Sequence, residues 1–215
     1  MVQPRCAQRG FTLIELIVVL AVMSILLGSM VPLLSATQAA ERYSIVEGEL
    51  DALGDSLTAY YYDQGSFPTS LTQVGFYGTY VLPGVDDDRL RDEWGGKTYY
   101  RLSTTTNPDT ITVYSVGDDG ADAGASAEQW KVAVSGAEPG NRRTRIKMRI
   151  IAGAMSDFLA SGGTLTGTWS ADRVALGLGQ EYQADGFGTD FLLQSYVLRS
   201  AGADRQAGTS DDLMF

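Results

Sequence analysis

A run of uncharged residues near the N-terminus constrains this chain more than any other feature. Residues 16–34 contain no charged side chain, and a single carboxylate, Glu15, stands immediately before them. A helix needs about 20 such residues to span the hydrocarbon core of a bilayer. An isolated charge in hydrocarbon is costly, so we expect Glu15 to meet a specific partner. The run therefore predicts a membrane-spanning helix with one functional acid at its start.

The ten residues before this helix are polar and basic. They include Arg5 and Arg9 and end at Gly10. Positive charge ahead of a membrane helix favours a cytoplasmic N-terminus and translocation of the chain that follows. A removable secretory signal carries its small-residue cleavage site after the apolar core, whereas Gly10 precedes the core. Cleavage after Gly10 would therefore leave the apolar helix in the mature chain.

The composition of the chain narrows its chemistry. The 215 residues carry a net charge of −10, no histidine, and one cysteine, Cys6, in the basic leader. An acidic chain lacks the positive charge that phosphate-rich ligands require, which disfavours nucleic acid as a partner and favours metal cations. Because the chain has no histidine, it lacks the residue that most often serves as general base, as zinc ligand and as partner of the nucleophile in a catalytic triad. We therefore expect a protein that is not an enzyme.

The N-terminal residues resemble a known processing signal. Gly10 is followed by Phe11-Thr12-Leu13-Ile14-Glu15 and the apolar run, which is similar to the class III signal of type IV pilins and type II secretion pseudopilins. The resemblance implies that a prepilin peptidase cuts between Gly10 and Phe11, that the new amino group of Phe11 is methylated, and that Glu15 acts in assembly. In a filament the Phe11 amine and the Glu15 carboxylate would neutralise each other. Because desolvation offsets much of the attraction in a buried pair, we expect this pair to set the stagger of subunits.

A helical pattern continues beyond the apolar run. Apolar residues recur at helical spacing, at Ile45, Leu50, Leu53, Leu57 and Tyr60 or Tyr61. Acidic residues occupy the opposite face, which is typical of an amphipathic helix. The pattern predicts one helix over about 12–62 and a break at 63–70. Strand patterns follow at 98–102 and 110–115.

The order of motifs after this helix resembles the major pseudopilin of type II secretion. A Gly-Ser-Phe-Pro segment covers 65–68, an Asp-Glu-Trp-Gly turn covers 92–95, and Ser-Val-Gly-Asp-Asp-Gly at 115–120 stands where that family has a calcium loop. Glu93 replaces the proline usual in the family, and the paired aspartates usual after Gly120 are missing. The resemblance covers roughly residues 11–130. It implies an α+β fold in which a long N-terminal helix packs on a small antiparallel sheet.

The C-terminal half repeats the order of these motifs. Asp92-Glu93-Trp94-Gly95 matches Asp185-Gly186-Phe187-Gly188, and Ser115-Val116-Gly117-Asp118 matches Ser200-Ala201-Gly202-Ala203. A helical pattern at 146–159, with Ile146, Ile150 and Ile151 among its apolar residues, takes the place of residues 45–61. Matching order over most of a domain predicts a second, similar α+β module. The alternative is that both halves merely contain common glycine and aspartate turns.

These patterns predict four parts of the chain. They are a cleaved leader at 1–10, a membrane-spanning and filament-core helix at 11–34, a first pseudopilin-like module at 35–135 and a second at 141–215. Gly136, Pro139 and Gly140 mark a predicted linker between the two modules.

Two acidic, glycine-rich loops are the candidate calcium sites. Calcium takes about six to eight oxygen ligands from carboxylates, carbonyls and hydroxyls. The candidates in the second loop are Leu198, Ser200, Asp204, Asp211 and Asp212, and those in the first are Ser115, Asp118, Asp119 and Asp122. Neither loop has the spacing of an EF-hand. The alternative is a pair of solvated turns that bind no metal.

Together these features predict a structural subunit of a type II secretion pseudopilus. Its expected partners are other pseudopilins, in a homo- or hetero-polymer, a prepilin peptidase, the inner-membrane secretion platform and the membrane itself. The resemblance implies a single-pass inner-membrane protein with its globular part in the periplasm, which becomes part of a filament after assembly. Two alternatives stay open: a pilin or minor pilin of a type IV pilus, and a membrane-anchored calcium-binding or carbohydrate-binding module.

Overall fold

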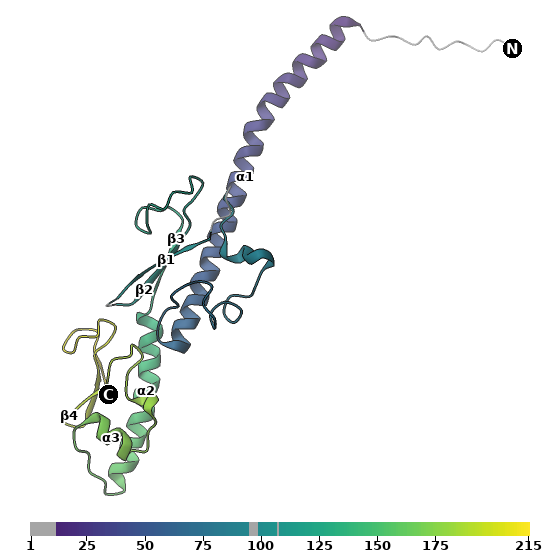
Figure 1. Ribbon diagram of the computed structural model, residues 1–215. Helices are drawn as coiled ribbons and strands as arrows, with labels where there is room; N and C mark the ends of the chain where they lie inside the picture. Colours follow the sequence, from purple (N-terminus) through teal and green to yellow (C-terminus); the bar gives the residue numbers. More distant parts are fainter. Residues whose placement is uncertain (1–11, 95–98, 107) are drawn as a thin grey trace, which may run out of the picture. The chain divides into compact units, whose positions relative to one another are not determined.

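The computed structural model describes residues 12–94, 99–106 and 108–215, apart from the side chains of residues 29–34, 86 and 87. The protein is α+β, as the sequence predicts. It divides into two units, residues 1–45 and residues 46–215 (Figure 1). The described part of the first unit is one stretch of helix, and the second unit contains both sheets.

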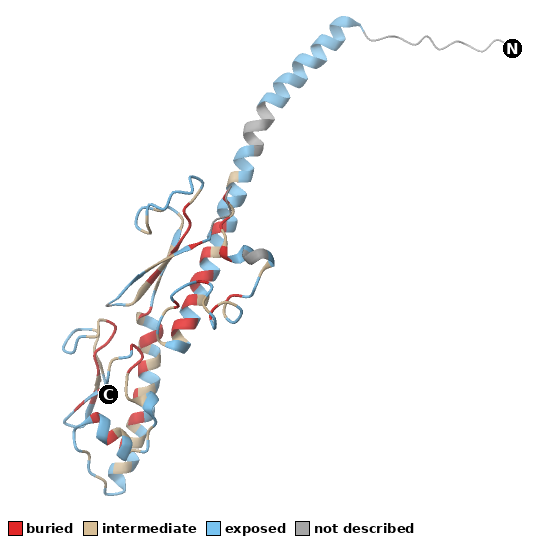
Figure 2. Ribbon diagram, viewed as in Figure 1, coloured by how far each residue is buried: buried red, intermediate tan, exposed pale blue. Residues whose placement is uncertain are grey.

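In the first unit, helix α1 (Leu13–Gln64) begins with a run of uncovered apolar side chains. Leu13 is 79% exposed, and every other large apolar residue from Ile14 to Leu27 is exposed as well. Figure 2 shows this stretch as a continuous exposed ribbon. The bounds of α1 agree with the helix predicted over 12–62. Within the residues that the structure describes, no helix is both long and apolar enough to cross a membrane.

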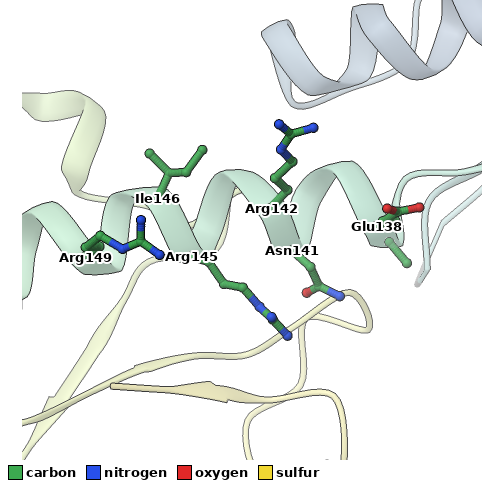
Figure 3. A pocket seen from close by; sticks show the side chains of 7 residues that line it. Glu138, Asn141, Arg142, Arg145, Ile146 and Arg149 are labelled. Atoms are coloured by element: carbon green, nitrogen blue, oxygen red, sulfur yellow. The ribbon is translucent and has the colours of Figure 1, made fainter.

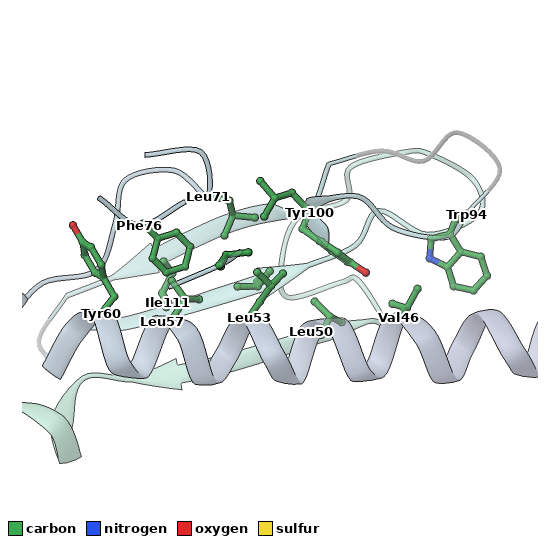
Figure 4. Close-up of a cluster of buried hydrophobic side chains, with 13 residues drawn as sticks. Val46, Leu50, Leu53, Leu57, Tyr60, Leu71, Phe76, Trp94, Tyr100 and Ile111 are labelled. Carbon is green, nitrogen blue, oxygen red and sulfur yellow. The ribbon is translucent and has the colours of Figure 1, made fainter. Parts of the chain in front are cut away.

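In the second unit, the C-terminal part of α1 packs on a three-stranded antiparallel sheet. Its strands are β1 (Arg101–Thr105), β2 (Thr110–Tyr114) and β3 (Lys131–Ser135), in the order β1-β2-β3. Alternate residues of the central strand, Ile111 and Val113, are buried, as the two-residue period of a strand requires. The α1 side chains in this core are Val46, Leu50, Leu53, Leu57 and Tyr60 (Figure 4). The predicted helix face was therefore right except at Ile45, which is 40% exposed while Val46 is buried.

The first strand lies later in the chain than the sequence pattern indicated. The prediction of a strand at 98–102 was wrong, because β1 begins at Arg101, and residue 98 lies outside the described residues. Tyr99 forms an isolated bridge with Arg91, and the Tyr100 N–H donates to the Leu90 carbonyl. The backbone here therefore pairs with the end of the short helix η1 (Val85–Leu90) before the sheet begins. The strand predicted at 110–115 is confirmed as β2, and β3 was not predicted.

The C-terminal half of the second unit has its own helices and sheet. Helix α2 (Ala137–Ala160) precedes α3 (Trp169–Ala175) and the short helix η2 (Gln180–Tyr182). Strands β4 (Leu192–Gln194), β5 (Val197–Ser200) and β6 (Leu213–Met214) form an antiparallel sheet in that order. A second apolar cluster joins Met148, Ile151 and Met155 of α2 to Trp169, Phe191, Leu193 and Leu198.

The predicted apolar face of α2 was partly wrong. Ile146 and Ile150 are 42% and 44% exposed. The buried row is instead Thr144, Met148, Ile151 and Met155, at the spacing of one helix face. Two isoleucines are therefore left on the outer face of α2.

The segment expected to be a linker is the start of α2. Pro139 stands in the first turn, where a helix tolerates proline because the missing N–H would have no partner there. A Cβ added to Gly136 would overlap the ring of Tyr61, and one added to Gly140 would overlap the ring of Phe187. These glycines permit close packing of α2 against both rings, so the linker interpretation was wrong.

A cluster of three side chains joins the two halves of the second unit. The Arg205 guanidinium donates to both carboxylate oxygens of Asp109, at 2.8 and 2.7 Å. The Tyr61 hydroxyl donates to the same carboxylate at 2.9 Å. Bidentate arginine–carboxylate pairs are among the stronger and more directional hydrogen bonds in proteins. The cluster holds the end of α1, the β1–β2 turn and the C-terminal loop in one arrangement.

We predict that stability falls at alkaline pH because of buried tyrosines. Burial and the Asp109 hydrogen bond raise the pKa of Tyr61 above its usual value, and burial and the Glu49 hydrogen bond do the same for Tyr100. The unfolded chain then loses these protons first, so the stabilisation is complete below pH about 10 and is lost as pH rises further. A Tyr61→Phe fragment lacking residues 1–40 should lose less free energy of unfolding between pH 9 and pH 11 than its parent, measured by urea titration. Identical losses would contradict the prediction.

Candidate functional site

Of the predicted processing and assembly residues, Glu15 alone lies within the described chain, and Gly10 and Phe11 lie outside it. Glu15 is in the first turn of α1. The Thr12 Oγ1 atom accepts a hydrogen bond from the Glu15 N–H at 3.4 Å. The exposed backbone N–H groups at a helix start favour a nearby carboxylate. The local structure thus places a negative charge at the end of the helix where Phe11 would become the new terminus.

Thr12 is a functional residue that the sequence analysis did not single out. Thr12 and Glu15 have the Thr-x-x-Glu spacing of a capping box, in which the threonine hydroxyl accepts from the third helical N–H. This spacing is itself a sequence signature of a helix start. The Thr12 hydroxyl therefore supports the start of the helix by accepting from the backbone N–H of Glu15.

The first acidic loop, which joins β2 to β3, is closed by its own hydrogen bonds. Asp119 accepts from the Ala121 N–H at 3.0 Å, and Asp122 accepts from the Gly124 N–H at 3.0 Å. The Lys131 ammonium donates to the carbonyls of Ala125 and Ser126 at 2.8 and 2.9 Å. A side-chain cation thus occupies carbonyl groups of this loop. The remaining candidate, Asp118, is exposed.

The second acidic loop, which joins β5 to β6, is ordered in a similar way. Asp211 accepts from the Asp204 N–H at 3.0 Å, Asp204 from the Gln206 N–H at 2.8 Å, and Asp212 from the Gly208 N–H at 2.7 Å. Hydrogen bonds from Thr209 and from the backbone lower the pKa of Asp211. The Leu198 carbonyl accepts from the Phe215 N–H at 3.0 Å, so this candidate ligand is part of the sheet.

The two candidate serines occupy equivalent positions and make the same buried hydrogen bond. The Ser115 hydroxyl donates to Asp92 and accepts from the Gly117 N–H at 3.0 Å. The Ser200 hydroxyl donates to Asp185 at 2.6 Å and accepts from the Gly202 N–H at 3.2 Å. All four aspartate and serine side chains are buried. Each serine thus satisfies a buried carboxylate and fixes the first turn of its acidic loop.

The described residues hold no group of three or more acidic, histidine or cysteine side chains placed to bind a metal ion. Carboxylate and carbonyl oxygens are the ligands that calcium prefers. The aspartates of both loops, however, bind separate backbone amides and do not converge on one point. Calcium binding at either loop stays a prediction.

If the second loop binds calcium, added calcium should raise the melting temperature of a fragment lacking residues 1–40. Binding to the native state alone stabilises it by about 2.7 kcal/mol when free calcium is 100 times its dissociation constant. The double variant Asp204→Asn, Asp211→Asn should lose this rise, which differential scanning calorimetry measures. The exposed Asp157 on α2 offers a matched control, Asp157→Asn, which should keep it. A parent that shows no calcium-dependent shift would remove the site.

Comparisons with known proteins identify relatives of part of this chain. Residues 5–31 match the family described as the prokaryotic N-terminal methylation motif. The chain is 33% identical to the type II secretion system core protein G of Klebsiella michiganensis, over 54% of this chain and 87% of that relative. It is 29% identical to the protein of the same name from Pseudomonas aeruginosa, over 56% of this chain and 91% of the relative. The protein of that name from Vibrio cholerae is 30% identical, over 54% and 85%.

The relatives thus match almost their whole length with little more than half of this chain. No solved structure matches it. The methylation motif contains Gly10, Phe11 and Glu15, the residues predicted to act in processing and assembly.

Proposed function

Because this chain belongs to the family of the type II secretion system core protein G, we propose that it assembles through α1 into a pseudopilus that serves protein export. Its role is structural, as a pseudopilin. The observation that carries the proposal is an exposed apolar helix whose first turn contains the carboxylate of Glu15, inside a methylation motif. Burial of this surface against the helices of neighbouring subunits is favourable, because it removes apolar side chains from water.

The same helix supports a membrane-anchored state before assembly. The uncharged run at 16–34 is long enough for a bilayer, and the side chains of residues 29–34 within it lie outside the described set. We place its N-terminal side in the cytoplasm, on the charge of Arg5 and Arg9, and the second unit in the periplasm. A prepilin peptidase would act at Gly10-Phe11, and the secretion platform of the inner membrane would receive the processed subunit.

The charge on Glu15 should be required for polymerisation and not for membrane insertion. A Glu15→Gln variant keeps a capping-box residue, because glutamine serves at this position as well as glutamate, but it loses the charge that meets the Phe11 amine. We expect normal insertion and processing and at least about a tenfold fall in filament yield, the effect of a loss of about 1.4 kcal/mol per assembly step. Quantitative blotting of sheared filaments against membrane fractions would measure both.

Glu41→Gln is a matched control for this experiment. Glu41 is an exposed acid on the same helix and lies outside the methylation motif. Its variant should assemble as the parent does. Parental filament yield from the Glu15→Gln variant would refute assembly through a neutralised pair.

We also propose that residues 137–215 are a second module related to the first. Each half contains a helix and a three-stranded antiparallel sheet whose strands lie in chain order. In each half, the buried serine stands at the end of the central strand or directly after it, and the acidic loop runs from this serine to the third strand. The matched bonds Ser115–Asp92 and Ser200–Asp185 support a common origin better than chance turns do.

If the halves are related modules, removal of either serine should weaken its own half first. Ser115→Ala and Ser200→Ala each leave a buried carboxylate short of one donor, which costs about 1–3 kcal/mol. Hydrogen exchange in a fragment lacking residues 1–40 should show the larger loss of protection in β1–β3 for Ser115→Ala and in β4–β6 for Ser200→Ala. Equal losses throughout both sheets would argue for a single, undivided domain.

A further inference from the structure

Helix α2 concentrates positive charge in an acidic protein. Five of the 16 basic residues of the chain fall within eight positions, at Arg142, Arg143, Arg145, Lys147 and Arg149. Lys147 is used within the fold, because its ammonium donates to the carbonyls of Ala184 and Asp185 at 2.7 and 3.1 Å. Arg142, Arg145 and Arg149 are exposed, and we call these three residues the basic stripe.

The basic stripe lines an open hollow on α2. Its other lining residues include Glu138, Asn141 and Ile146, and the hollow has a volume of about 680 Å³. Figure 3 shows Arg142 and Ile146 extending to one side of the helix and Asn141 and Arg145 to the other. Arg142 lies 5.2 Å from the centre of the Tyr62 ring, while Arg145 and Arg149 form no ion pair with any described residue. Two arginines and an exposed isoleucine are therefore available to a partner.

Helix α1 carries a row of the opposite sign in the second unit. Glu47, Asp51 and Asp55 are exposed at four-residue spacing, which puts them on one helix face. We call these three residues the acidic stripe. Asp55 lines two further hollows, and Asp51 lines one of them. Both hollows share Glu138 with the hollow of the basic stripe, and one of them also shares Arg142. One surface of the unit therefore has an acidic end on α1 and a basic end on α2.

We propose that the basic stripe of one copy binds the acidic stripe of a neighbouring copy in the polymer. At about 1.5 Å per helical residue, the acidic stripe is about 12 Å long and the basic stripe about 10 Å, so the two rows are similar in length and the acids of one copy can meet Arg145 and Arg149 of the next. The two stripes are different patches of one chain, and such a contact is heterologous and leads to an open helical polymer. The inference rests on the proposed function, because it needs a polymer of this chain.

The sign pattern favours a second copy over other anionic partners. Nucleic acid and an anionic lipid surface present unbroken negative charge, which Glu138 repels from within the same hollow as the arginines. A second copy supplies three carboxylates in a row of similar length, on a helix that carries them. Ile146 then packs between the helices and loses its exposed apolar surface.

The test is a cross-link between two differently tagged full-length copies with Cys6→Ser, so that introduced thiols are the only ones. One copy carries Ala52→Cys beside the acidic stripe and the other carries Ile146→Cys within the hollow. A short bis-maleimide should join them in isolated filaments. Adding Arg145→Glu and Arg149→Glu to the second copy should lower the cross-linked fraction about tenfold, or about 1.4 kcal/mol. Adding Asp51→Arg and Asp55→Arg to the first copy should then restore it to within about twofold.

A control copy with Val174→Cys on α3 replaces the Ile146→Cys copy, because Val174 is 65% exposed and lies outside both stripes. Its cross-linking with Ala52→Cys sets the background. Filaments that form normally but cross-link only at this background would overturn the stripe contact and leave the proposed function intact. Absence of any filament from the parent would overturn both.

Restoration by the second pair of charge reversals is the result that supports the contact, since a merely misfolded variant would not be rescued. A charge-reversed Arg145, Arg149 variant that loses binding to vesicles of anionic phospholipid, with an unchanged cross-link, would assign the basic stripe to a membrane surface instead and overturn the proposal.

Discussion

An apolar helix that its own chain leaves uncovered is the constraint on which this protein depends. Every large apolar side chain from Leu13 to Leu27 is exposed, and burial of apolar surface contributes about 25 cal/mol per Å². The subunit does not bury this apolar surface itself, so another molecule must cover it at all times. Lipid and the helices of other subunits are equally apolar, so exchange between them involves little change in hydrophobic free energy. In the assembly that we propose, the charge at Glu15 is the group that distinguishes the two environments.

The sequence predicts best the features that depend on residues close to one another along the chain. The periodicity of Leu50, Leu53 and Leu57 predicted the buried face of α1, and motif matching aligns Asp92 with Asp185 and Ser115 with Ser200, and in the structure Ser115 donates to Asp92 as Ser200 does to Asp185. The start of α2 was missed because glycine and proline indicate a turn unless their neighbours in space are known. Here the rings of Tyr61 and Phe187 require small residues at Gly136 and Gly140. The pair Asp109 and Arg205, separated by 96 residues, follows no local pattern.

The acidic loops show how the fold itself uses the aspartates that the sequence offers as calcium ligands. Carboxylates are ligands that calcium prefers. In both loops, aspartates also accept hydrogen bonds from nearby backbone N–H groups and so stabilise turns of the loop. In the first loop a lysine ammonium binds carbonyls, and in the second Arg205 leaves the loop to reach Asp109. Each loop is ordered by its own hydrogen bonds and begins at a buried serine.

The position of Tyr61 near the end of α1 has a mechanical consequence. In the assembly that we propose, a subunit that leaves the membrane is pulled by one helix, and the load passes into the rest of the chain at the far end of that helix. Asp109 and Arg205 receive it there through side-chain bonds in parallel with the main chain. The two halves are therefore connected by these side-chain bonds as well as by the backbone, and a pulling force on α1 reaches the C-terminal half through both connections.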